Sequence, residues 1–164
     1  HDYYMPCEER VSDYPRPPLI QVVNGSVSVE IAGETIAEDT SYIRVCETYH
    51  PPAIYIHQEA FKNGTLQQSS KHFSYCEWKG IAHYWSLSKA DGSDLRHRAG
   101  WSYPQPTKDF ELLADWISLY PRLVDCCTLE GEIVQPQPGN FYGGWITSWT
   151  LGPFKGDPNH PELI

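Results

Sequence analysis

The run Cys76-Glu77-Trp78-Lys79-Gly80 sets a carboxylate and an ammonium two residues apart, with aromatic residues on both sides. Because alternate residues of a β-strand point to the same face, Glu77 and Lys79 are expected to project together from an extended strand. Such a pair beside Trp78 could transfer a proton or hold a charged group of a ligand. It could equally be a solvated ion pair, which contributes little to stability. The sequence is compatible with both interpretations.

A second group of ionisable residues comes just before the corner Pro51-Pro52. Glu47 shares one face of a predicted strand with two apolar residues, so it would end a row that points into the core. Burial raises the pKa of a carboxyl group unless a cation pairs with it, and Arg44 and His50 are close in the sequence. The group is therefore either a candidate acid/base site or a structural network at the proline corner.

Aromatic side chains could supply the walls of a pocket. Trp145, after two glycines, is either part of a core strand with a bulge or part of such a wall, and Lys155 could close over it. We predict a hollow in which Glu77, Arg44 and Trp145 meet Lys79, and scatter of these four over separate outer faces with no concavity among them would contradict it. Its predicted acid/base residues are Glu77, Lys79, Glu47 and Tyr103, and its predicted ligand contacts are Arg44, His50, Tyr55, Trp78, Tyr84, Trp101, Tyr142, Trp145 and Lys155.

Charge and composition exclude several classes of function. The net charge of −9 argues against a nucleic-acid groove, which needs Lys and Arg to neutralise phosphates. No apolar run approaches the roughly 20 residues that span a bilayer. The five cysteines form no C-x-x-C motif, so we expect reduced thiols in a cytoplasmic protein and no zinc. We expect no metal and no cofactor, a small-molecule ligand as the partner, and make no prediction of oligomeric state.

Turn signals every eight to twelve residues between short apolar runs predict a mainly antiparallel β domain. Asn24-Gly25 and Glu130-Gly131 are typical hairpin turns, residues 72–79 read as a strand, and residues 61–70 read as a loop. Between Thr107 and Tyr120, apolar residues recur at i, i+3, i+4 and i+7, which predicts one α-helix packed on the sheet.

The chain divides into three predicted parts. Residues 1–18 are rich in proline and predict an extended arm, residues 19–156 a single domain, and residues 157–164 a tail. Met5 is the only methionine, and we expect it to be the natural first residue.

Several motifs resemble one family. They are Asp13-Tyr14-Pro15-Arg16-Pro17-Pro18, Arg44-Val45-x-Glu47-Thr48-x-His50-Pro51-Pro52, Cys76-Glu77-Trp78-Lys79-Gly80 with Tyr84-Trp85, Trp101-Ser102-Tyr103-Pro104, Pro136-Gln137-Pro138-Gly139, Phe141-Tyr142-Gly143-Gly144-Trp145-Ile146-Thr147 and Gly152-Pro153-Phe154-Lys155-Gly156. From Asp13 to Gly156 the chain resembles the DUF427 domain family, which also carries a nucleotidyltransferase-type label. The resemblance implies a β-tent fold, as in Mss4-like proteins. The zinc that those relatives often bind on paired C-x-x-C motifs is not carried over.

Three functions are compatible with these observations. The leading hypothesis is a small-molecule-binding domain with an aromatic pocket, in which Glu77 or Glu47 acts as a base without a cofactor, as in an isomerase, lyase or cyclase. The family label implies a nucleotide- or phosphate-handling transferase instead, although the sequence has neither a glycine-serine phosphate loop nor a close carboxylate pair for two metals. The third is a non-catalytic protein-interaction module.

Overall fold

The computed structural model describes residues 6–163, apart from the side chains of residues 70–72, so Met5 lies outside the described residues. The strands are β1 Glu9–Arg10, β2 Leu19–Ile31, β3 Glu34–Cys46, β4 Ala53–His57, β5 Leu66–Cys76, β6 Gly80–Leu87, β7 Arg96–Ser102, β8 Trp116–Leu119, β9 Cys126–Leu129, β10 Glu132–Ile133, β11 Gln135–Pro136, β12 Trp145–Ile146 and β13 Thr150–Leu151. Within the described part, every helical segment is a 3-10 helix: η1 Val11–Asp13, η2 Gln58–Ala60, η3 Lys108–Leu113, η4 Pro121–Leu123 and η5 Pro161–Leu163.

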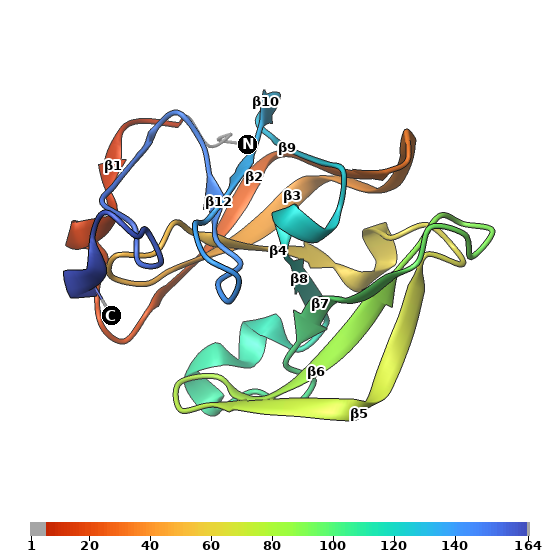
Figure 1. Cartoon of the computed structure of the whole chain (residues 1–164). Helices are drawn as coiled ribbons and strands as arrows, with labels where there is room; N and C mark the ends of the chain where they lie inside the picture. The colour runs from red at the N-terminus through yellow and green to blue at the C-terminus, as the bar shows by residue number, and fades with distance from the viewer. Residues whose placement is uncertain (1–5, 164) are drawn as a thin grey trace.

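One antiparallel sheet organises the chain, with strand order β10-β9-β2-β3-β4-β8-β7-β6-β5. Figure 1 shows the β5–β6 hairpin turned well away from the β2–β3 pair, so the sheet is strongly curved. The predicted mainly antiparallel β class is confirmed, and the relation to β-tent proteins stays a prediction. None of the helices among residues 6–163 combines the length and the apolar character needed to cross a membrane.

Apolar residues are buried on both faces of the sheet centre. Alternate residues Val27, Val29 and Ile31 of β2 point into the larger core cluster, as expected for a strand with one solvated face. In β3 and β4, successive residues point to opposite faces of the sheet. Ile43 and Tyr55 belong to a second core cluster, on the face opposite to the first. This second cluster forms the floor beneath the candidate site.

The predicted α-helix between Thr107 and Tyr120 is wrong in type and extent. A 3-10 helix covers Lys108–Leu113, with Phe110 in a non-helical conformation, and strand β8 follows from Trp116. β8 lies between β4 and β7 and pairs with both. Of the four apolar residues at helical spacing, Phe110 and Leu113 lie in η3, Ala114 ends it and Ile117 lies in β8. A spacing typical of one helix therefore runs across two different elements.

Two further predictions of local structure are corrected. Asn24-Gly25 is no hairpin turn, because β2 runs on to Ile31 with a register shift after Asn24. Residues 77–79 form the turn between β5 and β6, not the end of a strand, and β5 begins at Leu66 inside the predicted loop. The hairpin at Glu130-Gly131 is confirmed, since both residues have positive φ and Leu129 pairs with Glu132.

The two ends of the described chain lie side by side. β1 in the predicted arm pairs in parallel with β13, and Figure 1 shows the blue C-terminal segment beside the red N-terminal one. Val11 in the arm is fully buried, so the arm is packed against the domain. Residues 137–155, in the C-terminal segment, lie beside β4 and complete a cavity.

Candidate functional site

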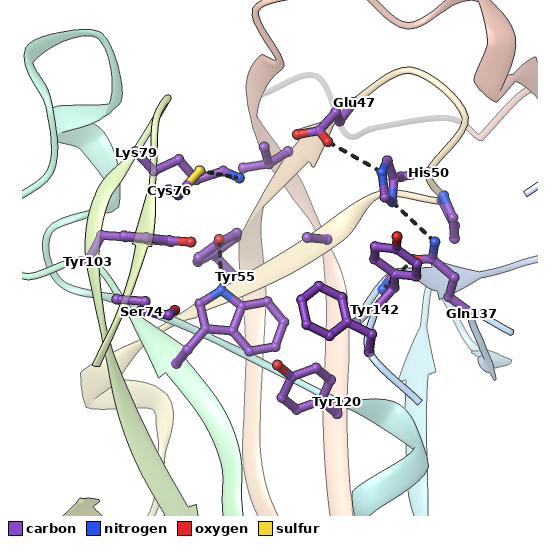
Figure 2. Close-up of a pocket in the computed structure, with 18 of the residues that line it drawn as sticks. Glu47, His50, Tyr55, Ser74, Cys76, Lys79, Tyr103, Tyr120, Gln137 and Tyr142 are labelled. Atoms are coloured by element: carbon purple, nitrogen blue, oxygen red, sulfur yellow. Dashed lines mark hydrogen bonds and ion pairs between the residues drawn. The ribbon is translucent and has the colours of Figure 1, made fainter. Parts of the chain in front are cut away.

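A cavity of about 520 Å³ lies where the curved sheet meets the C-terminal segment. Its volume falls within the range of small-molecule sites. Strands β3 to β7 supply one side, and residues 137–155 supply the other. Figure 2 shows Glu47 and His50 on one wall, Cys76 and Lys79 facing them, and Tyr120 at the opposite end from Glu47.

A chain of contacts leads from the backbone through Gln137 and His50 to Glu47. The backbone N–H of Gly144 donates to Oε1 of Gln137 at 3.0 Å, and Nε2 of Gln137 donates to the carbonyl oxygen of Lys155 at 2.8 Å. These two backbone groups decide which end of the Gln137 amide is the oxygen. The second amide hydrogen is then directed at Nδ1 of His50, 3.1 Å away, so Nδ1 accepts.

His50 is therefore neutral with its proton on Nε2, which lies 3.3 Å from Oε2 of Glu47 and faces it. Burial lowers the pKa of His50 below its ordinary value of 6.5. The Glu47 carboxylate raises this pKa and the ammonium groups of Lys155 and Lys79 lower it, with the net shift downward. The arrangement presents a carboxylate with a fixed direction to the cavity, held by a chain that starts at the backbone.

Tyrosine hydroxyls form the polar part of the floor. Nε1 of Trp101 donates to the hydroxyl of Tyr55 at 3.2 Å, and burial raises the pKa of that hydroxyl. Burial also raises the pKa of Tyr103. Figure 2 shows the two hydroxyl groups pointing towards each other. Both phenols stay protonated at neutral pH and can donate to a ligand oxygen.

Two ammonium groups reach this cavity from different elements. Nζ of Lys79 lies 5.8 Å from the ring centre of Tyr103 and 3.9 Å from Sγ of Cys76. Nζ of Lys155 lies 5.8 Å from the ring centre of Tyr142. Among the described residues, no carboxylate pairs with either ammonium group.

Two glycines allow the C-terminal segment to come this close. A Cβ on Gly143 would overlap the ring of Trp101, and one on Gly144 would overlap Pro51 and the Gln137 amide. The Gly-Gly pair is thus needed for close approach.

Most of the predicted site residues meet here, although Lys79 was predicted to lie on a strand and lies in a turn. The cavity is lined by Glu47, His50, Tyr55, Lys79, Tyr84, Trp101, Tyr103, Tyr142 and Lys155. Lys79 enters from the β5–β6 turn, so it shares no strand face with Glu77.

Arg44 and Trp145 do not line the cavity, which corrects the prediction that they meet Lys79. Arg44 is 4% exposed and points to the other face of β3, where it bonds both carboxylate oxygens of Glu9 at 2.7 and 2.8 Å. Strand alternation separates it from Val45 and Glu47. Trp145 is 1% exposed in the larger core, where Nε1 donates to the carbonyl oxygen of Leu119, so the core-strand interpretation holds.

Glu77 and Trp78 lie in an adjoining hollow of about 410 Å³. Glu47, His50 and Lys155 line both spaces, so these three side chains form the wall between them. Glu77 has no ion pair with Lys79 among the described residues. Of the four residues predicted to meet, only Lys79 enters the main cavity.

The sequence reasoning missed Gln137, Tyr120 and Ser74 as cavity residues. Gln137 stands in the motif Pro136-Gln137-Pro138-Gly139. The two prolines that flank it are the sequence feature that could have marked it as a candidate site residue. Among residues 6–163, no group of three or more His, Cys, Asp or Glu side chains is placed to hold a metal ion.

Comparison with known proteins identifies a family without a described activity. No curated protein matches the chain. A family model described as a domain of unknown function, DUF427, matches residues 19–130, which is more than half of the sequence. The match ends before Gln137, Tyr142 and Lys155, so it covers β2 to β9 of the sheet but not the segment that completes the cavity. On this match, the chain belongs to the DUF427 family.

Proposed function

We propose that the chain binds a small organic molecule in the main cavity and moves a proton on it with Glu47 as the general base. The observation that carries this proposal is the fixed chain from Gly144 through Gln137 and His50 to Glu47. A carboxylate held in one direction beside aromatic walls is suited to proton abstraction.

The proposed reaction needs no added cofactor. Glu47 takes a proton from the ligand, and the bonding electrons move onto a neighbouring oxygen of the ligand. The hydroxyl groups of Tyr55 and Tyr103 and the ammonium of Lys79 stabilise the negative charge that develops there. Return of the proton by Glu47 to another atom, or to the opposite face of the same atom, gives an isomerisation. In a lyase step the electrons return from the oxygen to expel a group from the neighbouring carbon, and Glu47 protonates that leaving group. In a cyclisation the electrons attack an electrophilic carbon of the same molecule, and Glu47 protonates the atom that receives the displaced electron pair. His50 and Gln137 act as positioning residues.

A thermal-shift screen tests the binding part. Metabolite-sized carbonyl compounds that occupy the cavity should raise the melting temperature in proportion to affinity and concentration. Ser74 is exposed at the cavity margin, so Ser74→Trp should fill the opening without disturbing the core and should remove these shifts. Shifts that persist in Ser74→Trp would place the ligands elsewhere and contradict the proposal.

Deuterium exchange tests the proton transfer. Each stabilising compound is incubated with the protein in D₂O, and NMR follows the loss of its acidic C–H signals. Glu47→Gln should keep the thermal shift and lose about 10²-fold or more of the exchange rate. Glu77→Gln is the matched control and should exchange at the wild-type rate. Equal rates for Glu47→Gln and wild type would overturn Glu47 as the base.

A phosphate-handling function is the second candidate, as the family label implied. Arg44 no longer contributes to it, because it bonds Glu9 on the opposite face of the sheet. Lys79 and Lys155 remain as possible phosphate contacts.

A further inference from the structure

We propose that the molecule bound in the main cavity carries one anionic group, which lies between the ammonium groups of Lys79 and Lys155. This inference rests on the proposed function, because it names the chemical class of the ligand for the same cavity. Replacing the anionic group of the ligand by a neutral group of the same shape should lower the affinity. The inference can therefore be tested separately from proton transfer.

The charges that line the main cavity do not cancel. Lys79 and Lys155 supply two positive charges, Glu47 supplies one negative charge, and His50 is neutral, which leaves one positive charge. This local excess stands out in a chain of net charge −9. A ligand with one negative charge would balance it.

The adjoining hollow has the opposite balance. Its carboxylates belong to Glu47, Glu77 and Glu162, and its cations belong to Arg16 and Lys155, which leaves one negative charge. An anionic group is therefore favoured in the main cavity and disfavoured in the adjoining hollow. The contrast also orients the ligand, with its anionic group on the side of Lys79 and Tyr103.

The surroundings of the two ammonium groups favour recognition of an anion over internal pairing. Each one lies over a tyrosine ring, which keeps the side chain in place without neutralising its charge. The ammonium groups of both lysines lower the pKa of His50, although Lys79 lies on the wall that faces His50. Trp101 and Tyr142 also line the cavity and supply aromatic surface for a planar molecule with a charged end.

Three naphthalene probes separate charge from shape. They are 2-naphthoate, the neutral 2-naphthamide and 2-naphthyl phosphate, and calorimetric titration of the full chain at pH 7.5 measures their affinities. We expect naphthoate to bind about tenfold or more tightly than naphthamide. Lys79→Gln and Lys155→Gln should each weaken naphthoate by about tenfold and leave naphthamide unchanged.

Two variants serve as controls. Lys108 is exposed on η3 outside the cavity, so Lys108→Gln should bind all three probes like wild type. Glu47→Gln removes the one negative charge of the cavity and should tighten naphthoate binding several-fold, even where it abolishes proton transfer. Circular dichroism of each variant verifies that it folds.

The outcomes distinguish this inference from the proposed function. Equal affinity of naphthoate and naphthamide would overturn the anion and leave the cavity as a binding site. Failure of both probes to bind would contradict both proposals. Tighter binding of naphthyl phosphate than of naphthoate, with the same loss in both lysine variants, would support the inference with phosphate as the anionic group.

Discussion

Gln137 is the residue on which the direction of the Glu47 carboxylate depends. Its amide contacts two backbone groups and one imidazole, and it is 2% exposed. Because the backbone fixes the amide, the amide fixes the proton position of His50, and His50 then holds Glu47. Gln137, which itself lines the cavity, thus acts on the Glu47 carboxylate through His50.

Replacing Gln137 by alanine should break this chain. Gln137→Ala leaves Gly144 N–H, the Lys155 carbonyl and His50 Nδ1 without their partner, and buried polar groups without partners cost about 1–3 kcal/mol. We expect a loss of that order in the free energy of unfolding, measured with urea. Long-range ¹⁵N–¹H spectra should show His50 changing from the Nε2–H form to a mixture of forms. Gln135→Ala, at an exposed position of β11, should change neither quantity.

The depressed pKa of His50 predicts a dependence of stability on pH. Below its ordinary value of 6.5, the unfolded chain binds a proton at His50 more readily than the folded chain does. Stability therefore falls as the pH drops below about 6.5 and continues to fall until the folded form also becomes protonated. Urea unfolding between pH 7.5 and 5 should fall more steeply for wild type than for His50→Gln. Parallel curves would show that His50 does not contribute.

At the residue scale, the sequence predicts contacts that are local and misses those that are distant. Glu47 and His50 are three positions apart, and their pairing follows from the loop that joins them. Gln137 reaches His50 from 87 positions away, and nothing in a single sequence encodes that meeting. Arg44 was misplaced because closeness in sequence outweighed strand alternation, which sends it to the opposite face.

At the scale of elements, the dipeptide Asn24-Gly25 alone did not distinguish a hairpin turn from a β-bulge. Asn24 pairs with Ser41 and Val27 pairs with Asp39, so β2 holds one extra residue between these pairs. The carboxylate of Glu130 fills the space beside Gly25, accepting from Ser26 N–H at 3.1 Å and from the Tyr42 hydroxyl at 2.6 Å. The mainly antiparallel β class could be predicted from local patterns, but this bulge depends on a side chain from the β9–β10 turn.

The bulge predicts a specific coupling between Gly25 and Glu130. A Cβ at position 25 would overlap the Glu130 carboxylate, which would have to leave both of its donors. Gly25→Ala should lower the free energy of unfolding by about 1–3 kcal/mol in urea. In a Glu130→Ala background the same substitution should cost less than about 0.5 kcal/mol, because the collision is gone. Equal costs in both backgrounds would show that the backbone, and not Glu130, requires glycine.

At the scale of the molecule, the two ends of the described chain are joined to the loop that lines the cavity. Glu9 N–H donates to the carbonyl of Trp149, and Tyr49 donates to Val11 and accepts from Lys155 N–H at 2.8 Å. The arm, the loop after β3 and the C-terminal segment are thus joined by backbone hydrogen bonds. The family match over residues 19–130 includes neither end, so it does not cover the segment that completes the cavity.

This connection predicts that a substitution in the arm will loosen the cavity wall at a distance. Glu9→Ala removes the carboxylate that holds Arg44, so β1 should detach more often from β13. Hydrogen exchange at the amides of Tyr49 and Lys155 should accelerate by about tenfold or more, while amides in the middle of β2 and β3 keep their protection. Glu8→Ala, at an exposed neighbouring position, should leave exchange unchanged. Uniform acceleration over the whole sheet would mean that Glu9 contributes only to global stability. A local role requires that exchange accelerates at the Lys155 amide and stays unchanged in β2 and β3, which Lys155 does not contact.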